Sequence, residues 1–538
     1  MNPIFTYEAE TKTWKGAEVP FPFAGKGVPE VVFDAMTKYL DHVCQISDDT
    51  GVIYTNEKML KTAISFATAL KYEFRIRKGD HVLLMTENYH YMAGTWLGCA
   101  FAQAVLCPFV FSEGTSVKDE VMNLLRQIAP KLLVMTDVTQ VESFKKILKD
   151  LGMDIPILMY ENKIEGCHDL KPHLEADIDI SCFKVPRVED PENTTFMLTL
   201  SSGTTAQSKL TITTHQQLLG CWLNGPIKMV GASTLRPGWQ SEGLTLFHSF
   251  IGTHTRVIRA QQDIDSFLRI VQKHKVHLAF MAPKDIYAAI RSPVIKEVDL
   301  SSLRLISSGG NHLSDKIRME FQKYIPKGTV NSSYGISDLC SKIAAAPVGT
   351  IAKPGSVGKV AKNMEVRVID DDGKRLGPGE IGEFHVKPTV TKFVGYYNNP
   401  ELTKNSIDED GFFKTGDVGK IDEEGNVFIV DRKKYLITYR GNWINTSQIE
   451  KIVLENVEGI EGVCVVDMED AENGIIPIIT VQPETGVSLD AKDIIATVHK
   501  HHEIKFETKV FFFESLPITI SGKYIKYRIR EMVKQLMA

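Results

Sequence analysis

The chain has 538 residues, of which 43% are hydrophobic and 24% charged, and its formal net charge is −5. This length exceeds what one hydrophobic core supports, so we expect two or more domains. The slightly acidic balance argues against nucleic acid as a partner, because nucleic-acid-binding proteins present a basic face. Eight cysteines without Cys-x-x-Cys spacing favour free thiols in a reducing compartment over a disulfide framework.

Short apolar runs alternate with helix-length amphipathic segments in the first third of the chain. The apolar runs are residues 82–85, 132–135 and 155–159, and residues 117–127 and 141–151 lie between them. The pattern returns at residues 278–281 and 303–306. Such alternation predicts parallel strands joined by crossover helices.

Residues 92–111 carry no formal charge over a length that could span a bilayer. Gln103, Pro108 and many small residues instead favour a buried helix over residues 91–100 and a buried strand that begins at residue 104.

The sequence pattern changes near Gly355. From there to about residue 430, short apolar segments alternate with glycine, proline and Asp-Asp-Gly turns. This pattern predicts short strands in a small β-rich barrel or subdomain. After Asp431 about a hundred residues remain, enough for a compact α/β unit with its own core.

The first chemical motif is Thr415-Gly416-Asp417, followed by residues 431–437 and then Gly441. Asp417 can accept hydrogen bonds from both hydroxyls of a ribose, and Arg432 can fork toward ribose or phosphate oxygens. The alternative is an ordinary turn followed by a solvated basic run.

The second motif leaves an apolar strand at residues 196–200. The motif contains Ser201, Ser202, Gly203, Thr204, Thr205 and Lys209. Its hydroxyl and backbone N–H groups can donate hydrogen bonds to phosphate oxygens, and the lysine can neutralise their charge. The alternative is a polar surface loop.

Further motifs follow in a fixed order: Phe247-His248, residues 308–313, 334–338, 353–358, 395–400, 415–417, 431–432 and 517–523. This succession resembles the acyl- and aryl-adenylate-forming superfamily of acyl-CoA synthetases, 4-coumarate-CoA ligases and beetle luciferases. It looks most like the insect luciferase-like and 4-coumarate-CoA-ligase-like branch. The resemblance covers nearly the whole chain.

The resemblance implies an α/β fold in two domains. Residues 1–430 would form a large AMP-binding domain of two parallel-type α/β subdomains plus a small β-barrel at about residues 350–430. Residues 431–538 would form a small, mobile α+β lid that turns about Asp431. The active site would lie in the cleft between lid and body.

The resemblance also implies roles for individual residues. Lys523 would bridge the substrate carboxylate and the α-phosphate, and His248 would stand between the acyl pocket and the nucleotide. Asp338 would bind magnesium, and Tyr334 would stack on adenine. Further contacts to nucleotide, acyl group or pantetheine thiol would come from Gly309, Gly310, Asn311, Gly335, Ser337 and Gly441.

The implied enzyme is an AMP-forming acid-thiol ligase that uses ATP, Mg²⁺ and, as second substrate, coenzyme A. It would convert a fatty or aromatic carboxylic acid to an acyl-adenylate and then to its thioester. A weakly active or non-catalytic binding protein, or a luciferase-like activity, remains an alternative. Ala206, Ser208 and Leu210 replace the family's usual glycine, proline and glycine, and Thr438 replaces a lysine used in the second half-reaction.

We find no recognisable targeting signal at either end of the sequence. The N-terminus has no charged and apolar run of the signal-peptide kind, and the last residues are not of the Ser-Lys-Leu type. We therefore expect an intracellular, cytoplasmic protein, with the peroxisome implied only by family members. The sequence does not define an oligomeric state.

Overall fold

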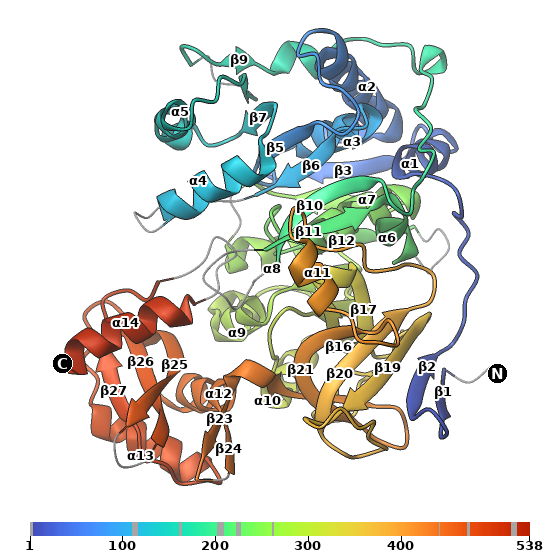
Figure 1. The fold of residues 1–538 in the computed structure, drawn as a ribbon. Helices are drawn as coiled ribbons and strands as arrows, with labels where there is room; N and C mark the ends of the chain where they lie inside the picture. Colours follow the sequence, from blue (N-terminus) through green and yellow to red (C-terminus); the bar gives the residue numbers. More distant parts are fainter. Residues whose placement is uncertain are drawn as a thin grey trace.

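The computed structural model describes residues 4–109, 117–160, 164–201, 209–221, 228–260, 263–440, 442–470, 474–517 and 524–537. It is a mixed α/β structure (Figure 1), as the strand–helix alternation predicts. Two large sheets, an antiparallel sheet and a C-terminal α/β region follow one another approximately in chain order.

The first large sheet has seven strands, and all neighbouring pairs except β11–β10 are parallel. Its order is β11 (Lys209–Thr214), β10 (Thr195–Ser201), β6 (Val105–Pro108), β5 (His81–Met85), β7 (Leu132–Met135), β8 (Ile157–Met159) and β9 (His168–Asp169). The helices between these strands are α3 (Met92–Phe101), α4 (Val117–Ile128) and α5 (Val141–Asp150). The predicted strands and crossover helices are confirmed here.

The uncharged segment is a helix and a strand, as predicted. All ten residues of α3 are buried, which explains why the segment carries no charge. None of the helices in the described ranges combines the length and apolar character needed to cross a bilayer.

The second large sheet has nine strands, parallel in its centre and antiparallel at both edges. Its order is β18 (Lys359–Val360), β17 (Ser341–Ala345), β16 (Thr329–Ile336), β15 (Leu305–Ser308), β14 (Leu278–Met281), β12 (Val230–Ser233), β13 (Thr255–Ile258), β3 (Val43–Ser47) and β4 (Ile53–Thr55). The prediction for residues 303–306 is two residues early, because an apolar pattern cannot include the two serines that end β15.

Six helices accompany this sheet and the edge of the first. They are α1 (Val28–Thr37), α2 (Asn56–Tyr72), α7 (Gln240–Ile251), α8 (Ile264–His274), α9 (Pro283–Arg291) and α10 (Asp315–Gln322), with the short α6 (His215–Gly220) after β11. The start of α8 illustrates local control by sequence: Asp263 accepts a hydrogen bond from the backbone N–H of Ser266 and so caps the helix.

The third sheet is antiparallel and has six strands. Its order is β1 (Phe5–Glu8), β2 (Thr13–Gly16), β19 (Met364–Ile369), β20 (Gly382–Pro388), β21 (Phe413–Ile421) and β22 (Val427–Arg432). The β-rich texture after Gly355 predicts most of it. The N-terminal hairpin β1–β2 joins it from far along the chain and was not predicted.

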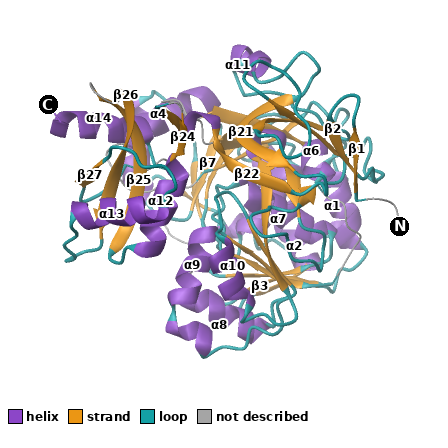
Figure 2. Ribbon diagram, turned by 90° about the horizontal axis from the view of Figure 1, so that it is seen from below, coloured by secondary structure: helices purple, strands orange, loops and turns teal. Residues whose placement is uncertain are grey.

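The C-terminal strands form separate sheets beside the body (Figure 2). This region holds β23 (Leu436–Tyr439), β24 (Asn442–Asn445), α12 (Thr446–Asn456), β25 (Ile460–Asp470), β26 (Gly474–Pro483), α13 (Ala491–His501), β27 (Lys509–Phe512) and α14 (Lys526–Met537). Its buried apolar residues form a cluster drawn only from residues 437–533. The helix α11 (Pro400–Asn405) precedes it in the body.

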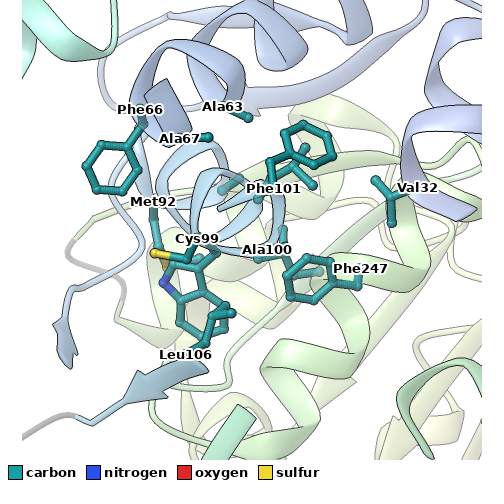
Figure 3. Packing of buried hydrophobic residues seen from close by; sticks show 14 of the residues in the cluster. Val32, Ala63, Phe66, Ala67, Met92, Cys99, Ala100, Phe101, Leu106 and Phe247 are labelled. Carbon is teal, nitrogen blue, oxygen red and sulfur yellow. The ribbon is translucent and has the colours of Figure 1, made fainter. Parts of the chain in front are cut away.

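Helix α2 packs closely on α3 in the hydrophobic cluster that also contains Phe247 of α7 (Figure 3). A Cβ on Gly94 would lie 2.5 Å from Cγ2 of Thr62, and one on Gly98 would lie 2.9 Å from the carbonyl oxygen of Ala63. No larger residue fits at either position without a shift. Phe247 of α7 packs in the same cluster, so this core sets the position of the neighbouring His248.

Candidate active site

An ion pair joins the ends of β21 and β22. Asp417 and Arg432 are direct partners in the antiparallel register, and Nε of Arg432 lies 2.7 Å from Oδ1 of Asp417. Arg432 also donates to the carbonyl oxygen of Thr415 at 3.4 Å. The hairpin thus brings together the two residues that the sequence analysis grouped across 14 intervening positions.

Tyr334 joins this pair from β16 of another sheet. Its hydroxyl donates to Oδ2 of Asp417 at 2.6 Å. Burial raises the pKa of Tyr334 well above its ordinary value, and the Asp417 charge raises it further, so the hydroxyl remains a donor. Each carboxylate oxygen of Asp417 therefore already has a donor, either the Tyr334 hydroxyl or the Arg432 guanidinium. A ligand with several hydroxyl groups would share or replace these donors.

A second polar group surrounds Asp338. The Tyr396 hydroxyl donates to Oδ1 of Asp338, and Nζ of Lys209 lies 5.2 Å from the centroid of the Tyr396 ring. Burial lowers the pKa of Lys209, while the Asp338 charge opposes that change. The arrangement places a lysine and a carboxylate around one buried aromatic ring. Tyr396 was missed as a site residue, although its motif at residues 395–400 was recognised.

Asp338 is a single carboxylate rather than part of a ready-made metal cage. In the described residues no three His, Cys, Asp or Glu side chains gather as a potential metal site. Mg²⁺ commonly keeps several waters and binds one or two carboxylates together with substrate phosphates. One carboxylate here fits a magnesium ion that arrives with a nucleotide.

The glycines after β15 allow close approach of backbone. A Cβ on Gly309 would lie 3.2 Å from the carbonyl oxygen of Ser333. Gly310 has a φ of +87°, which a larger residue rarely adopts, and Asn311 is exposed next to it.

The segment around Tyr334 continues into a tight reversal. Gly335 is exposed, while Ser337 is half-buried and begins a 3₁₀ turn, Ser337–Leu339. Cys340 ends the turn in the left-handed region with φ of +49°. This reversal presents Ser337 and Asp338 between β16 and β17.

From sequence alone, the apolar run of residues 244–250 would be read as a strand with a single histidine, but these residues lie in helix α7, so that prediction is wrong. The apolar residues Leu244, Phe247 and Ile251 recur at helical spacing, which sequence reasoning overlooked. Nε2–H of His248 donates to the carbonyl oxygen of Leu218 at 2.8 Å. Burial lowers the pKa of His248 to about 4, so the ring is neutral near pH 7.

Several predicted site residues lie outside the described residues: Lys523, Ser202, Gly203, Thr204, Thr205 and Gly441. Ser201 ends β10, and only the backbone of Thr438, in β23, is described.

Leu210 does not belong to a loop. It lies in β11 opposite Leu200, and only 2% of its surface is exposed within the apolar core. The replacement of the family's glycine by Leu210 therefore does not stiffen a phosphate loop, as the resemblance would suggest, because an ordinary strand position needs no glycine.

From sequence alone, His499, His501 and His502 near the end of α13 would be read as a solvated helix face rather than a metal site, because no cysteine or carboxylate completes a ligand set. His501 is exposed, but Nε2 of His499 donates to the Phe506 carbonyl at 2.9 Å and His502 is buried. That expectation was wrong for His502, which contributes to local packing.

Residues 32–397 match the family described as AMP-binding enzyme. The chain is 27% identical to 4-coumarate–CoA ligase 3 of Oryza sativa subsp. japonica, over 93% of this chain and 91% of that protein. It is 28% identical to luciferin 4-monooxygenase of Luciola mingrelica, over 91% of each. Its fold is similar to ATP-bound MatB from Rhodopseudomonas palustris, with a TM-score of 0.79, 22% identity and coverage of 95% and 99% of the two chains. With most of its length matched, this chain belongs to the AMP-binding enzyme family, the ATP-dependent adenylate-forming acyl- and aryl-CoA ligases.

Proposed function

We propose that this chain activates a fatty or aromatic carboxylic acid with ATP and then transfers the acyl group to coenzyme A. The observation that carries the proposal is the convergence of Tyr334, Asp417 and Arg432 from two sheets. The relatives named 4-coumarate–CoA ligase support the acid and the thiol acceptor.

The Asp417–Arg432 pair is assigned to the ribose. A carboxylate accepts hydrogen bonds from two adjacent hydroxyls, and the guanidinium can donate to the nearby oxygens. We assign Tyr334 to adenine stacking, with Gly309, Gly310, Asn311 and Gly335 providing close backbone approach to base and acyl group.

The phosphates are assigned to the other polar group. Lys209 would neutralise phosphate charge together with the hydroxyl-rich segment Ser201–Thr205, and Ser337 would donate to a phosphate oxygen. Asp338 would hold Mg²⁺, which supplies charge neutralisation to the departing pyrophosphate.

In the first step a carboxylate oxygen of the acid attacks the α-phosphorus, and the bond to pyrophosphate breaks with its electron pair on the leaving group. Lys523 would stabilise the charge that develops between acid and α-phosphate, where a preplaced cation is most effective. His248, neutral and bonded to the Leu218 carbonyl, would shape the boundary of the acyl pocket rather than transfer a proton.

In the second step the thiol sulfur of coenzyme A attacks the acyl carbonyl and AMP leaves. We propose that residues 431–538 act as a lid that turns about Asp431 relative to residues 1–430, so that Gly441 then lines the thiol channel. Thr438 provides no cation on that face, which makes the thioester step the slower half.

Acid-dependent exchange of labelled pyrophosphate into ATP tests the first step across a panel of fatty and aromatic acids. Coenzyme A is then added to score thioester formation. Lys523→Ala should abolish exchange while ATP binding persists, and Lys534→Ala, on the exposed face of α14, is the matched control. ATP binding without exchange for any acid would favour the non-catalytic alternative, and exchange in Lys523→Ala equal to the parent would remove Lys523 from the site.

A further inference from the structure

Lys342 lies directly opposite Gly335 in the antiparallel pair β16–β17. A Cβ on Gly335 would lie 2.6 Å from the carbonyl oxygen of Ser341 and 3.3 Å from Cα of Lys342, so the strands approach too closely there for a side chain. Opposed residues of an antiparallel pair project to the same face. Lys342 therefore shares its face with an exposed, side-chain-free backbone position.

Lys342 belongs to a different electrostatic group from the nucleotide residues. The charges that act on Lys209 are those of Asp338 and Arg432, whereas the Lys342 charge acts on Cys221 and His248. Asp338 and Lys342 are joined only by the reversal at Cys340. The hairpin thus has a phosphate side at Asp338 and a second charged side at Lys342.

The Lys342 side chain is exposed, and yet burial lowers the pKa of its ammonium. Solvent reaches this side chain although much protein surrounds it. Such partial desolvation of a cation costs free energy unless an anion compensates it.

No carboxylate in the described part of the chain supplies such an anion. No Asp or Glu carboxylate among the described residues lies within 4.0 Å of the Lys342 ammonium, which takes part in none of the ion pairs found there. The Cys221 sulfur is the one group whose charge raises the pKa of Lys342, and it offsets only part of the lowering by burial. The other neighbour that Lys342 affects, the His248 ring, is neutral. The face that Lys342 shares with Gly335 therefore carries a positive charge that no described carboxylate compensates.

We propose that the acid substrate carries a second anionic group, such as a second carboxylate, and that Lys342 binds this group while the other carboxyl is activated. The inference rests on the proposed function and narrows its substrate class to acids with an anionic far end. Such a molecule would lie over Gly335, with its reacting end toward Asp338 and its far end at Lys342. Lys342 would be a specificity-determining residue.

The test compares matched acids in the exchange assay: a fatty acid with the α,ω-dicarboxylic acid of equal length, and benzoate with terephthalate. The parent should prefer the diacid by on the order of tenfold or more in kcat/KM, the scale of one charge-assisted contact. Lys342→Met should abolish the preference through the KM of the diacid and leave the monoacid and the KM of ATP unchanged. Lys316→Met, an exposed position on α10, should change neither.

Other outcomes overturn the proposal. If Lys342→Met affects both acids equally, or if only the KM of ATP rises, Lys342 serves folding or phosphate binding. A parent that prefers monoacids also contradicts it.

Calorimetric titration of the same acids separates this proposal from failure of the proposed function. If no acid supports exchange, the ligase assignment fails. Tighter binding of diacids by the parent, lost in Lys342→Met, would still support the anion site, and equal binding by both proteins would exclude it.

Discussion

Two arginine–carboxylate pairs in this protein have the same chemistry and different surroundings. Arg256 of β13 and Glu242 of α7 lie 2.5 Å apart with side chains 7% and 1% exposed. Arg432 and Asp417 lie 2.7 Å apart, but 36% of the Arg432 side chain is exposed. The first pair is sealed inside the body, and the second keeps one charged edge open beside Tyr334.

The difference separates stability from binding. A sealed pair cannot meet a ligand, so its contribution is to hold α7 against the nine-stranded sheet. A pair with an exposed cation keeps N–H donors available to a ligand, but solvent weakens the attraction between its two charges. Charge and proximity alone therefore do not distinguish a buried carboxylate whose cation can still meet a ligand from one whose cation cannot, and the access of solvent to the cation does.

Breaking the sealed pair should have the largest effect. Arg256→Met leaves the buried Glu242 without its cation and should lower the free energy of unfolding by about 3–5 kcal/mol, measured by urea denaturation. Arg269→Met removes an exposed pair with Glu297 and should cost about 0–1 kcal/mol. Equal losses in the two variants would contradict the distinction between sealed and exposed pairs.

Breaking the open pair should reduce binding instead. Asp417→Ala removes a charge-assisted acceptor and should weaken the binding of Mg-ATP by about 1.5–3 kcal/mol, measured by calorimetry. Arg269→Met serves again as the control and should bind like the parent. Undiminished affinity in Asp417→Ala would show that the ribose lies elsewhere.

The contrast extends to two histidines. Burial lowers the pKa of His215 to about 3 and that of His248 to about 4, from 6.5. The folded pKa is below the unfolded one, so the stabilisation is complete above pH 6.5 and is lost as the pH falls toward the folded value. At pH 5 each ring should account for a loss of roughly 2 kcal/mol.

Urea denaturation at pH 7 and pH 5 measures this loss. His215→Asn should show a smaller loss on acidification than the parent, and the exposed His501→Gln should show the same loss as the parent. If His215→Asn keeps the full pH dependence, other groups are responsible.

Ala206→Gly gives a smaller effect at the phosphate end. If the hydroxyl-rich segment must bend around phosphates, restored backbone freedom should raise the pyrophosphate exchange rate a few-fold, about 0.5–1 kcal/mol. Leu210→Gly would instead remove a buried side chain from β11 and would report on packing rather than on the loop. An unchanged rate would mean that alanine is compatible with the loop conformation.

Thr438→Lys should have a similarly small effect, confined to the second half-reaction. The added cation should speed single-turnover conversion of preformed acyl-adenylate to thioester by about 0.5–1 kcal/mol, the scale of a single added charge. Pyrophosphate exchange should not change. A parent that already forms thioester as fast as the variant would show that residue 438 is dispensable.

Much of the fold follows from local pattern. Residues 132–135 are β7 as predicted, and α3 explains the uncharged segment, because period and length are local properties. The hairpin Phe5–Gly16 could not be placed, since its partner Glu365 lies some hundreds of residues away. His248 was misassigned because a single polar residue in an apolar run hides helical period.

The candidate site was predictable where motifs are contiguous and not where it depends on side-chain contacts across sheets. Asp417 and Arg432 were paired correctly, and the hairpin register explains why. The contact of Tyr334 with Asp417, and the role of Tyr396 beside Asp338, depend on the meeting of separate sheets. The unpaired charge of Lys342 could be recognised only when its neighbours were known.

Acid-dependent exchange of pyrophosphate into ATP, measured in the parent, Asp417→Ala and the Arg269→Met control, shows whether the open ion pair belongs to an adenylate-forming site. We expect exchange in the parent with at least one carboxylic acid, a loss of about tenfold or more at subsaturating ATP in Asp417→Ala, and parental rates in the control. Absence of exchange with every acid, or equal rates in Asp417→Ala and the parent, would contradict an adenylate-forming site at this open ion pair.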